Sequence, residues 1–249
     1  KKDAPPSGSN DALESYSDEE QTSLSVVGPV VAKIGNTEYE TLQEAINNAK
    51  SGDVITLQDD LTLTEGLRFI GSGDNADQWK NITVDANGKK LTLNNLGIYA
   101  TRCKVTITNC PALTVNAGKN PGLTDINEEN ANISAVFFCP GTLILAKCAA
   151  VNITNPDPET GGSGLCIYNG GDLYIQDNTH FTVSGFMNGI PVNPGEEGKG
   201  GCSGIYIDSD KNVNNDYKTI TGQIVVSDNS SLTATECYHN GITANPVDI

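Results

Sequence analysis

Residues 41–58, TLQEAINNAKSGDVITLQ, contain the one convincing amphipathic helix of the chain and a strand directly after it. The apolar residues recur at i, i+3, i+4 and i+7, which is one helix face: Leu42, Ala45, Ile46 and Ala49. Thr41 is a suitable N-cap with Glu44 as its capping-box partner, and we expect Gly52 to end the helix. The β-branched run from Val54 predicts a strand. One short helix before many strands predicts a lid over the end of their core.

The remainder of the chain repeats a pattern of three short strands. Second strands start at Val105, Leu143, Leu173 and Ile224. A third strand starts eight residues after each of them, at Leu113, Val151, Phe181 and Leu232. First strands start at Ile98, Ala135, Leu165, Ile205 and Ile242. Each set of three can bury its apolar side chains only against the sets beside it, which predicts an all-β, parallel β-helix with three short strands per coil. A β-sandwich is the alternative, but the constant offset of eight residues favours the helix.

Two regions are predicted from composition. Residues 1–23 are rich in Ser, Asp, Glu and Pro and poor in large apolar residues, which predicts a disordered tether. Residues 24–249 form the predicted β-helix domain. A further first strand begins at Ile242, so we expect either that a longer protein continues beyond residue 249 or that the domain ends in an uncapped coil.

The charge of the chain excludes some classes of partner. The formal net charge is −16 and only two arginines are present, Arg68 and Arg102, so no basic stripe exists to bind nucleic acid. No apolar stretch is long enough to predict a membrane span. Seven cysteines occur without a CxxC motif and with only two histidines, which argues against a zinc site. This strongly acidic composition fits a soluble secreted protein that binds neutral glycans or cations.

The repeat has insertions, most of them at one corner. They fall between third and first strands at 117–132, 155–162 and 185–202, and once between first and second strands at 208–221. Loops gathered along one side of a solenoid are a usual place for a binding surface. Insertions that the fold merely tolerates are the alternative.

Residues 31–63, VAKIGNTEYETLQEAINNAKSGDVITLQDDLTL, resemble the opening of pectate-lyase-like β-helix domains of bacterial secreted and surface proteins. The resemblance implies a right-handed, single-stranded parallel β-helix with an N-terminal capping helix, an extracellular or cell-surface location, and frequent involvement with polysaccharides. The fold hosts lyases, hydrolases, adhesins and binding modules, so it does not fix an activity.

The catalytic signatures of the enzymatic members are not matched. Neither His180 nor His239 is flanked by the NTD, DD or GHG motifs of the hydrolases, and Asp59 and Asp60 lie at a predicted turn. We therefore expect a non-catalytic module that binds polysaccharide or another extracellular ligand, such as a host or bacterial surface glycan. The alternatives are a polysaccharide lyase or glycoside hydrolase with a non-standard active site, and a structural stalk or adhesin segment.

The insertion DSDKNVNND suggests a calcium site. Oxygen-bearing side chains occupy every second position: Asp208, Asp210, Asn212, Asn214 and Asp216. Calcium prefers six to eight oxygen ligands, and this spacing is typical of looped calcium sites. Val213 replaces the expected turn glycine and Thr219 replaces the expected bidentate acid, so an ordinary polar loop is the alternative.

Outward positions of the third strands form the first predicted ligand surface. They pair as Thr114/Asn116, Asn152/Thr154, Thr182/Ser184 and Thr233/Thr235, with Thr92/Asn94 as a candidate preceding pair. Stacked coils would place them in two ladders of short hydroxyl and amide groups, a face that could contact a sugar chain. The alternative is that Thr and Asn are simply good exposed strand residues.

Aromatic residues form the second predicted ligand surface. First strands place Tyr99, Val136, Cys166 and Tyr206 outward, with Tyr168 and Tyr174 nearby and Trp79 in a polar insertion. Exposed aromatic rings stack on the apolar faces of sugars, but a Tyr that covers a neighbouring backbone is common.

Two cysteines are predicted to stack. Cys110 and Cys148 lie three residues before third strands in consecutive coils, within reach of a disulfide. Stacked free thiols are an equally good alternative.

Overall fold

The computed structural model describes residues 28–94, 97–117, 134–156, 163–186, 203–208, 222–237 and 241–245. The described residues are mostly β, with 55% strand and 4% helix. Among the described residues, no helix is both long and apolar enough to cross a membrane. The predicted tether at 1–23 and most of the predicted insertions lie outside the described residues.

The strands form three open sheets. Sheet A begins with an antiparallel pair, β1 (Ala32–Ile34) and β2 (Thr37–Tyr39), of which β1 pairs with β3. Its six further strands are β3 (Val54–Leu57), β6 (Lys80–Asp85), β9 (Cys103–Thr108), β12 (Gly141–Ala146), β15 (Asp172–Gln176) and β18 (Gln223–Val226). Sheet B consists of β4 (Leu61–Leu63), β7 (Leu91–Asn94), β10 (Leu113–Asn116), β13 (Val151–Thr154), β16 (His180–Phe186) and β19 (Ser231–Cys237). Sheet C consists of β5 (Leu67–Ile70), β8 (Ile98–Thr101), β11 (Ser134–Phe138), β14 (Ser163–Ile167), β17 (Ile205–Asp208) and β20 (Ile242–Asn245).

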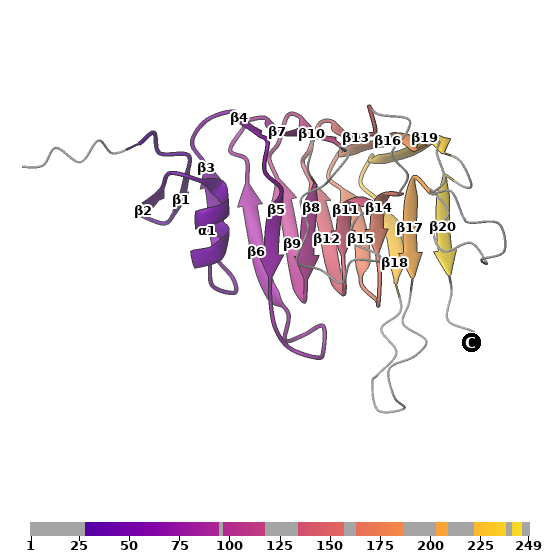
Figure 1. Ribbon diagram of the computed structural model, residues 1–249, viewed down its shortest axis with the longest axis horizontal. Helices are drawn as coiled ribbons and strands as arrows, with labels where there is room; N and C mark the ends of the chain where they lie inside the picture. The colour runs from indigo at the N-terminus through magenta and orange to yellow at the C-terminus, as the bar shows by residue number, and fades with distance from the viewer. Residues whose placement is uncertain are drawn as a thin grey trace, which may run out of the picture.

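From β3 onward the chain visits sheets A, B and C in a fixed cyclic order, and each strand pairs in parallel with the strand three places later. We call three successive strands, one from each sheet, a coil. The coils follow one another along the long axis of the molecule (Figure 1). The predicted all-β repeat with parallel strands is therefore confirmed.

The register of one first strand differs from the prediction. Val136 pairs with Ile98 and Leu165, which point inward, so Phe137 and not Val136 lies opposite Tyr99 on the outer face. The sequence Ser134–Phe138 is apolar at almost every position and gives no alternation from which the register could be read.

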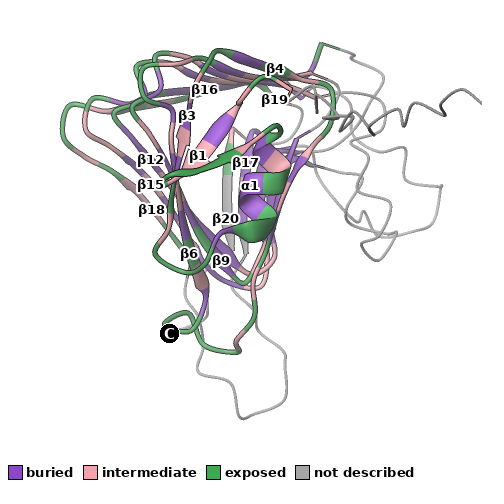
Figure 2. Cartoon of the chain, turned by 90° about the vertical axis from the view of Figure 1, so that its left-hand side faces the viewer, coloured by how far each residue is buried: buried purple, intermediate pink, exposed green. Residues whose placement is uncertain are grey.

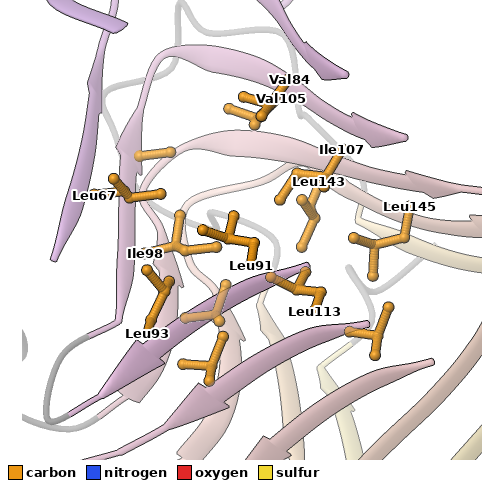
Figure 3. Close-up of a cluster of buried hydrophobic side chains, with 14 of the residues drawn as sticks. Leu67, Val84, Leu91, Leu93, Ile98, Val105, Ile107, Leu113, Leu143 and Leu145 are labelled. Carbon is orange, nitrogen blue, oxygen red and sulfur yellow. The ribbon is translucent and has the colours of Figure 1, made fainter. Parts of the chain in front are cut away.

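The core lies between the three sheets. Inward side chains from neighbouring coils point toward one another, among them Leu67, Val84, Leu91, Ile98 and Val105 (Figure 3). Each is at most 2% exposed. Because burial of a Val, Leu or Ile side chain contributes about 1.5–3 kcal/mol, the stacked rows stabilise each coil through its neighbours.

Helix α1 (Leu42–Asn48) lies across one end of this core (Figure 2). The Thr41 side chain accepts a hydrogen bond from the Glu44 N–H at 3.1 Å, as the N-cap prediction requires. The predicted inner face is buried and belongs to the core: Leu42, Ala45, Ile46 and Ala49. The predicted end at Gly52 was wrong, because the helix ends at Asn48 with an extended Ala49 as C-cap, and Gly52 lies in the next turn.

The turns from sheet A to sheet B explain the constant offset. Five of the six described turns contain a residue in the left-handed region, with φ between 53° and 57°: Asn87, Asn109, Lys147, Asp177 and Asp228. The Asn109 side-chain amide also donates to Asp85 Oδ1 in the preceding coil at 3.0 Å. Asn and Asp tolerate this conformation better than most residues, so a tight turn recurs at this corner while the chain varies more at other corners.

Candidate functional site

The outer face of sheet B carries two continuous ladders of short polar side chains. The first row follows the strand register through six strands: Thr62, Thr92, Thr114, Asn152, Thr182 and Thr233. The second row contains Asn94, Asn116, Thr154, Ser184 and Thr235. The predicted stacking of the third-strand pairs, including Thr92/Asn94, is thus confirmed as an arrangement, and Thr62 extends it. No residue of either row is charged.

The two rows differ in how their polar groups are used. In the second row, the Asn116 side-chain amide donates to Asn94 Oδ1 at 2.8 Å, and the Thr154 hydroxyl donates to Asn116 Oδ1 at 2.9 Å. These bonds hold the side chains in place. Within the part of the chain that the structure describes, first-row side chains have no hydrogen-bond partner from the protein. The same holds for Ser184 and Thr235 of the second row.

Three of the four predicted tyrosines gather on the outer face of sheet C. Tyr99, Phe137, Cys166 and Tyr206 follow one another in register, with Tyr168 packed beside them. The rings of Tyr99 and Phe137 are stacked, with centroids 6.0 Å apart and planes 13° from parallel.

This aromatic row is not a solvent-exposed platform. Tyr99 is 8% exposed and Phe137 4%, while Tyr168 and Tyr206 are half-buried. Burial raises the pKa of the Tyr99 hydroxyl, with the nearby Cys139 adding to the shift. The expectation that Tyr99 is exposed for stacking on sugar rings was wrong, because its ring packs against Phe137 in this cluster.

Tyr174 lies on sheet A, apart from the other three tyrosines. Its hydroxyl donates to Asp172 Oδ2 at 3.1 Å and accepts from the Gln223 side-chain amide at 2.9 Å. Desolvation and the Asp172 carboxylate raise its pKa. The hydroxyl is thus held by two protein partners, and the predicted tyrosine set does not form one surface.

Trp79 was also expected at the surface of a polar insertion. It is only 5% exposed, and its indole N–H has no hydrogen-bond partner in the described part of the chain. Its ring is therefore part of the packed interior of that segment and is not presented to solvent.

The predicted calcium site falls mainly outside the described residues. Asp208 is the last residue of β17, and Asp210, Asn212, Asn214 and Asp216 are not described. Within the described ranges, no three His, Cys, Asp or Glu side chains gather as a metal site would require. Calcium binding by this segment stays a prediction.

The possible acid–base groups have structural partners. Asp59 Oδ1 accepts from the Asp60 N–H at 2.8 Å, and Asp60 Oδ1 accepts from the Lys90 N–H at 2.8 Å in the next coil. Both carboxylates therefore stabilise turns. His180 Nδ1 lies 2.9 Å from Ser231 Oγ at the exposed, paired starts of β16 and β19, with no third group among the described residues to orient the pair.

Cys110 and Cys148 are buried free thiols, so the structure contains the second of the two predicted states. The Cys148 thiol donates to the Ile107 carbonyl at 3.4 Å. Burial raises the pKa of Cys148 to about 12, and Cys110 beside it contributes. Such a thiol stays protonated and is a poor nucleophile at neutral pH.

Comparison with known proteins gives no relative for this chain. No family model matches it, and neither a curated protein nor a solved structure matches it significantly. The case for a function therefore depends on the geometry of the chain itself.

Proposed function

We propose that the protein is a right-handed, single-stranded parallel β-helix of the pectate-lyase-like kind. We further propose that it is an extracellular or cell-surface module that binds an uncharged polysaccharide without catalysing a reaction. The observation that carries the proposal is the first-row ladder on sheet B, whose side chains have no hydrogen-bond partner among the described residues.

The chemistry of the ladder suits a sugar chain. A Thr hydroxyl and an Asn amide can each donate and accept, as sugar hydroxyls do. Neighbouring strands lie about 4.8 Å apart, so the row offers one polar group per coil along an extended ligand. The second row supports the first, because its internal hydrogen bonds fix the side chains beside the ligand.

Charge favours a neutral ligand. The ladder has no charged residue, while the chain as a whole has a net charge of −16 and would repel a polyanion at long range. An acidic polysaccharide would also gain no ion pair from Thr or Asn.

The test removes hydroxyls while keeping the shape of the strand. The double variant Thr114→Val, Thr182→Val replaces two first-row hydroxyls, and Val is favoured in strands. The matched control is Thr83→Val, Thr106→Val, two paired outward threonines on sheet A. We expect binding on an array of neutral glycans to weaken by on the order of tenfold or more in the first variant only.

The same glycan array distinguishes the binding module from an enzyme and from a structural stalk or adhesin segment. It is assayed with and without calcium, and for new reducing ends and unsaturated uronates. Turnover of any glycan would show an enzyme with a non-standard site. Failure to bind any glycan would favour a stalk or adhesin segment, and equal losses in both variants would place binding away from sheet B.

A further inference from the structure

The outer face of sheet A carries an apolar strip across β12, β15 and β18. Ile144, Tyr174 and Val225 follow one another in register, one from each strand. The three strands lie side by side (Figure 1), so these side chains are about 4.8 Å apart from coil to coil. All three are half-buried, which leaves part of each exposed to solvent. The strip is therefore an apolar surface with one aromatic ring at its centre.

A row of polar groups lies along one side of this strip. Asp172 precedes Tyr174 by two residues and so points to the same face of the sheet, and Gln223 is its register partner in β18. The Gln223 N–H donates to Asp172 Oδ1 at 3.2 Å, and the Asp172 N–H donates to Thr142 Oγ1 at 3.3 Å. These bonds hold the polar edge of the strip in place.

The ring of Tyr174 lies over the sheet because its hydroxyl is held at this polar row. The hydroxyl donates to Asp172 Oδ2 at 3.1 Å and accepts from the Gln223 side-chain amide at 2.9 Å. Residues i and i+2 of a strand are about 6.6 Å apart, so a ring standing straight out from the sheet would hold its hydroxyl away from the short Asp172 side chain. One ring face is thus turned toward the sheet and the other away from it. This orientation is set before any ligand arrives, which reduces the ordering cost of binding.

Asp172 brings a negative charge to the edge of the strip. Within the described ranges, no Lys or Arg forms an ion pair with its carboxylate. Each of its oxygens accepts one hydrogen bond from the protein and can accept a second from a ligand. The net charge of −16 adds a long-range attraction for cations. An aromatic face beside a carboxylate suits a ligand that has both an apolar face and a positive charge.

We propose that this strip binds a sugar that carries a protonated amine, such as a glucosamine unit of a chitosan chain. The C–H face of the sugar ring stacks on Tyr174 between Ile144 and Val225, and the ammonium group donates to Asp172. The site is on a different sheet from the first-row ladder and takes a charged ligand, so this inference does not depend on the function proposed above.

The experiment is calorimetric titration of the whole chain with a chitosan oligosaccharide, at mildly acidic pH, where the amine is protonated. The fully N-acetylated oligosaccharide is the comparison, because acetylation removes the charge and keeps the ring face. We expect the chitosan oligosaccharide to bind at least about tenfold more tightly, and added salt to weaken its binding. No binding of chitosan, or equal affinity for the two ligands, would overturn the proposal.

Two variants locate the site. Tyr174→Ala removes the stacking face, and we expect binding of the chitosan oligosaccharide to weaken by on the order of tenfold. Asp172→Asn removes the charge but keeps an oxygen for the Tyr174 hydroxyl, and we expect binding to weaken by about two- to fivefold. The matched control Asp77→Asn removes the same charge from an exposed turn outside the strip and should leave the affinity unchanged.

Tyr174→Phe is the second ring variant. It keeps the stacking face and removes the hydroxyl that anchors the ring, so we expect a smaller loss of affinity than with Ala. An affinity unchanged in both Tyr174 variants would overturn the proposal. Equal losses in Asp172→Asn and Asp77→Asn would also overturn it, because net charge alone would then attract the ligand. Thermal unfolding of each variant checks the fold, and the two Asp variants still decide if Tyr174→Ala unfolds.

Discussion

The two ends of the stack are built from the same kind of coil but end differently. At the first end, α1 buries Leu42, Ala45 and Ile46 against the core, and Gln43 satisfies the backbone of β5. At the last described coil, Val226 and Ile242 are substantially exposed. An inward side chain is buried only when a neighbour covers each side of its coil, so a repeat needs a lid or a partner at its ends.

A substitution in α1, which covers the first end of the core, should have the largest effect on stability. Ile46→Ala removes a fully buried side chain between α1 and the core, and we expect a loss of about 2–5 kcal/mol in the free energy of unfolding. The control Ile242→Ala changes the same residue type at the open end and should cost about 1 kcal/mol or less, because that side chain is already 45% exposed. Urea denaturation measures both, and equal losses would contradict the difference between the ends.

The hydrogen bonds from Gln43 to the edge strand β5 should contribute less to the free energy of unfolding than the burial of Ile46. Gln43→Ala removes both side-chain hydrogen bonds to the Arg68 backbone, and we expect a loss of about 1–3 kcal/mol in the free energy of unfolding. Asn47→Ala is the control, because it removes a neighbour of Gln43 on α1 but keeps both bonds to Arg68. Hydrogen exchange at the Arg68 amide should accelerate in the first variant and not in the second.

The N-cap contributes less. Thr41→Ala removes the oxygen that accepts from the Glu44 N–H, and about 1 kcal/mol of stability should be lost. Thr41→Ser keeps that oxygen and should restore most of the loss. If Ser and Ala destabilise the chain equally, the cap bond does not hold the lid in place.

The last expected effect is confined to alkaline pH and concerns thiols in the middle and at the end of the stack. The pKa of Cys148 is raised to about 12 from an ordinary value of 9.0, so the folded chain holds this proton more tightly than the unfolded chain. The resulting stability is present below pH 9 and is lost as the pH rises toward about 12. Cys148→Ala should flatten this part of the pH–stability curve.

Alkylation followed by mass mapping checks the same contrast. At pH 8 we expect Cys148 to react only through unfolding, and Cys237 in the last described coil to react much faster, because it is half-buried. Equal labelling rates would mean that the middle of the stack opens as readily as its end.

Several local features could be predicted from sequence because they depend on short-range rules. The helix follows from apolar spacing and a good N-cap. The ladders on sheet B follow from the constant eight-residue offset, which a left-handed turn residue such as Asn109 enforces. The register of β11 could not be predicted, since Ala135 to Phe138 are all apolar and neighbouring strands alone decide which of them point inward.

The sequence by itself determined the lid, the three-strand repeat and the polar ladder, because turn geometry and side-chain alternation act within a few residues. Only the tertiary structure decided that Tyr99 is covered, that Tyr174 lies on a different sheet, and that Val226 is exposed. Burial depends on what packs against a surface from distant parts of the chain, and local periodicity carries no information about that contact.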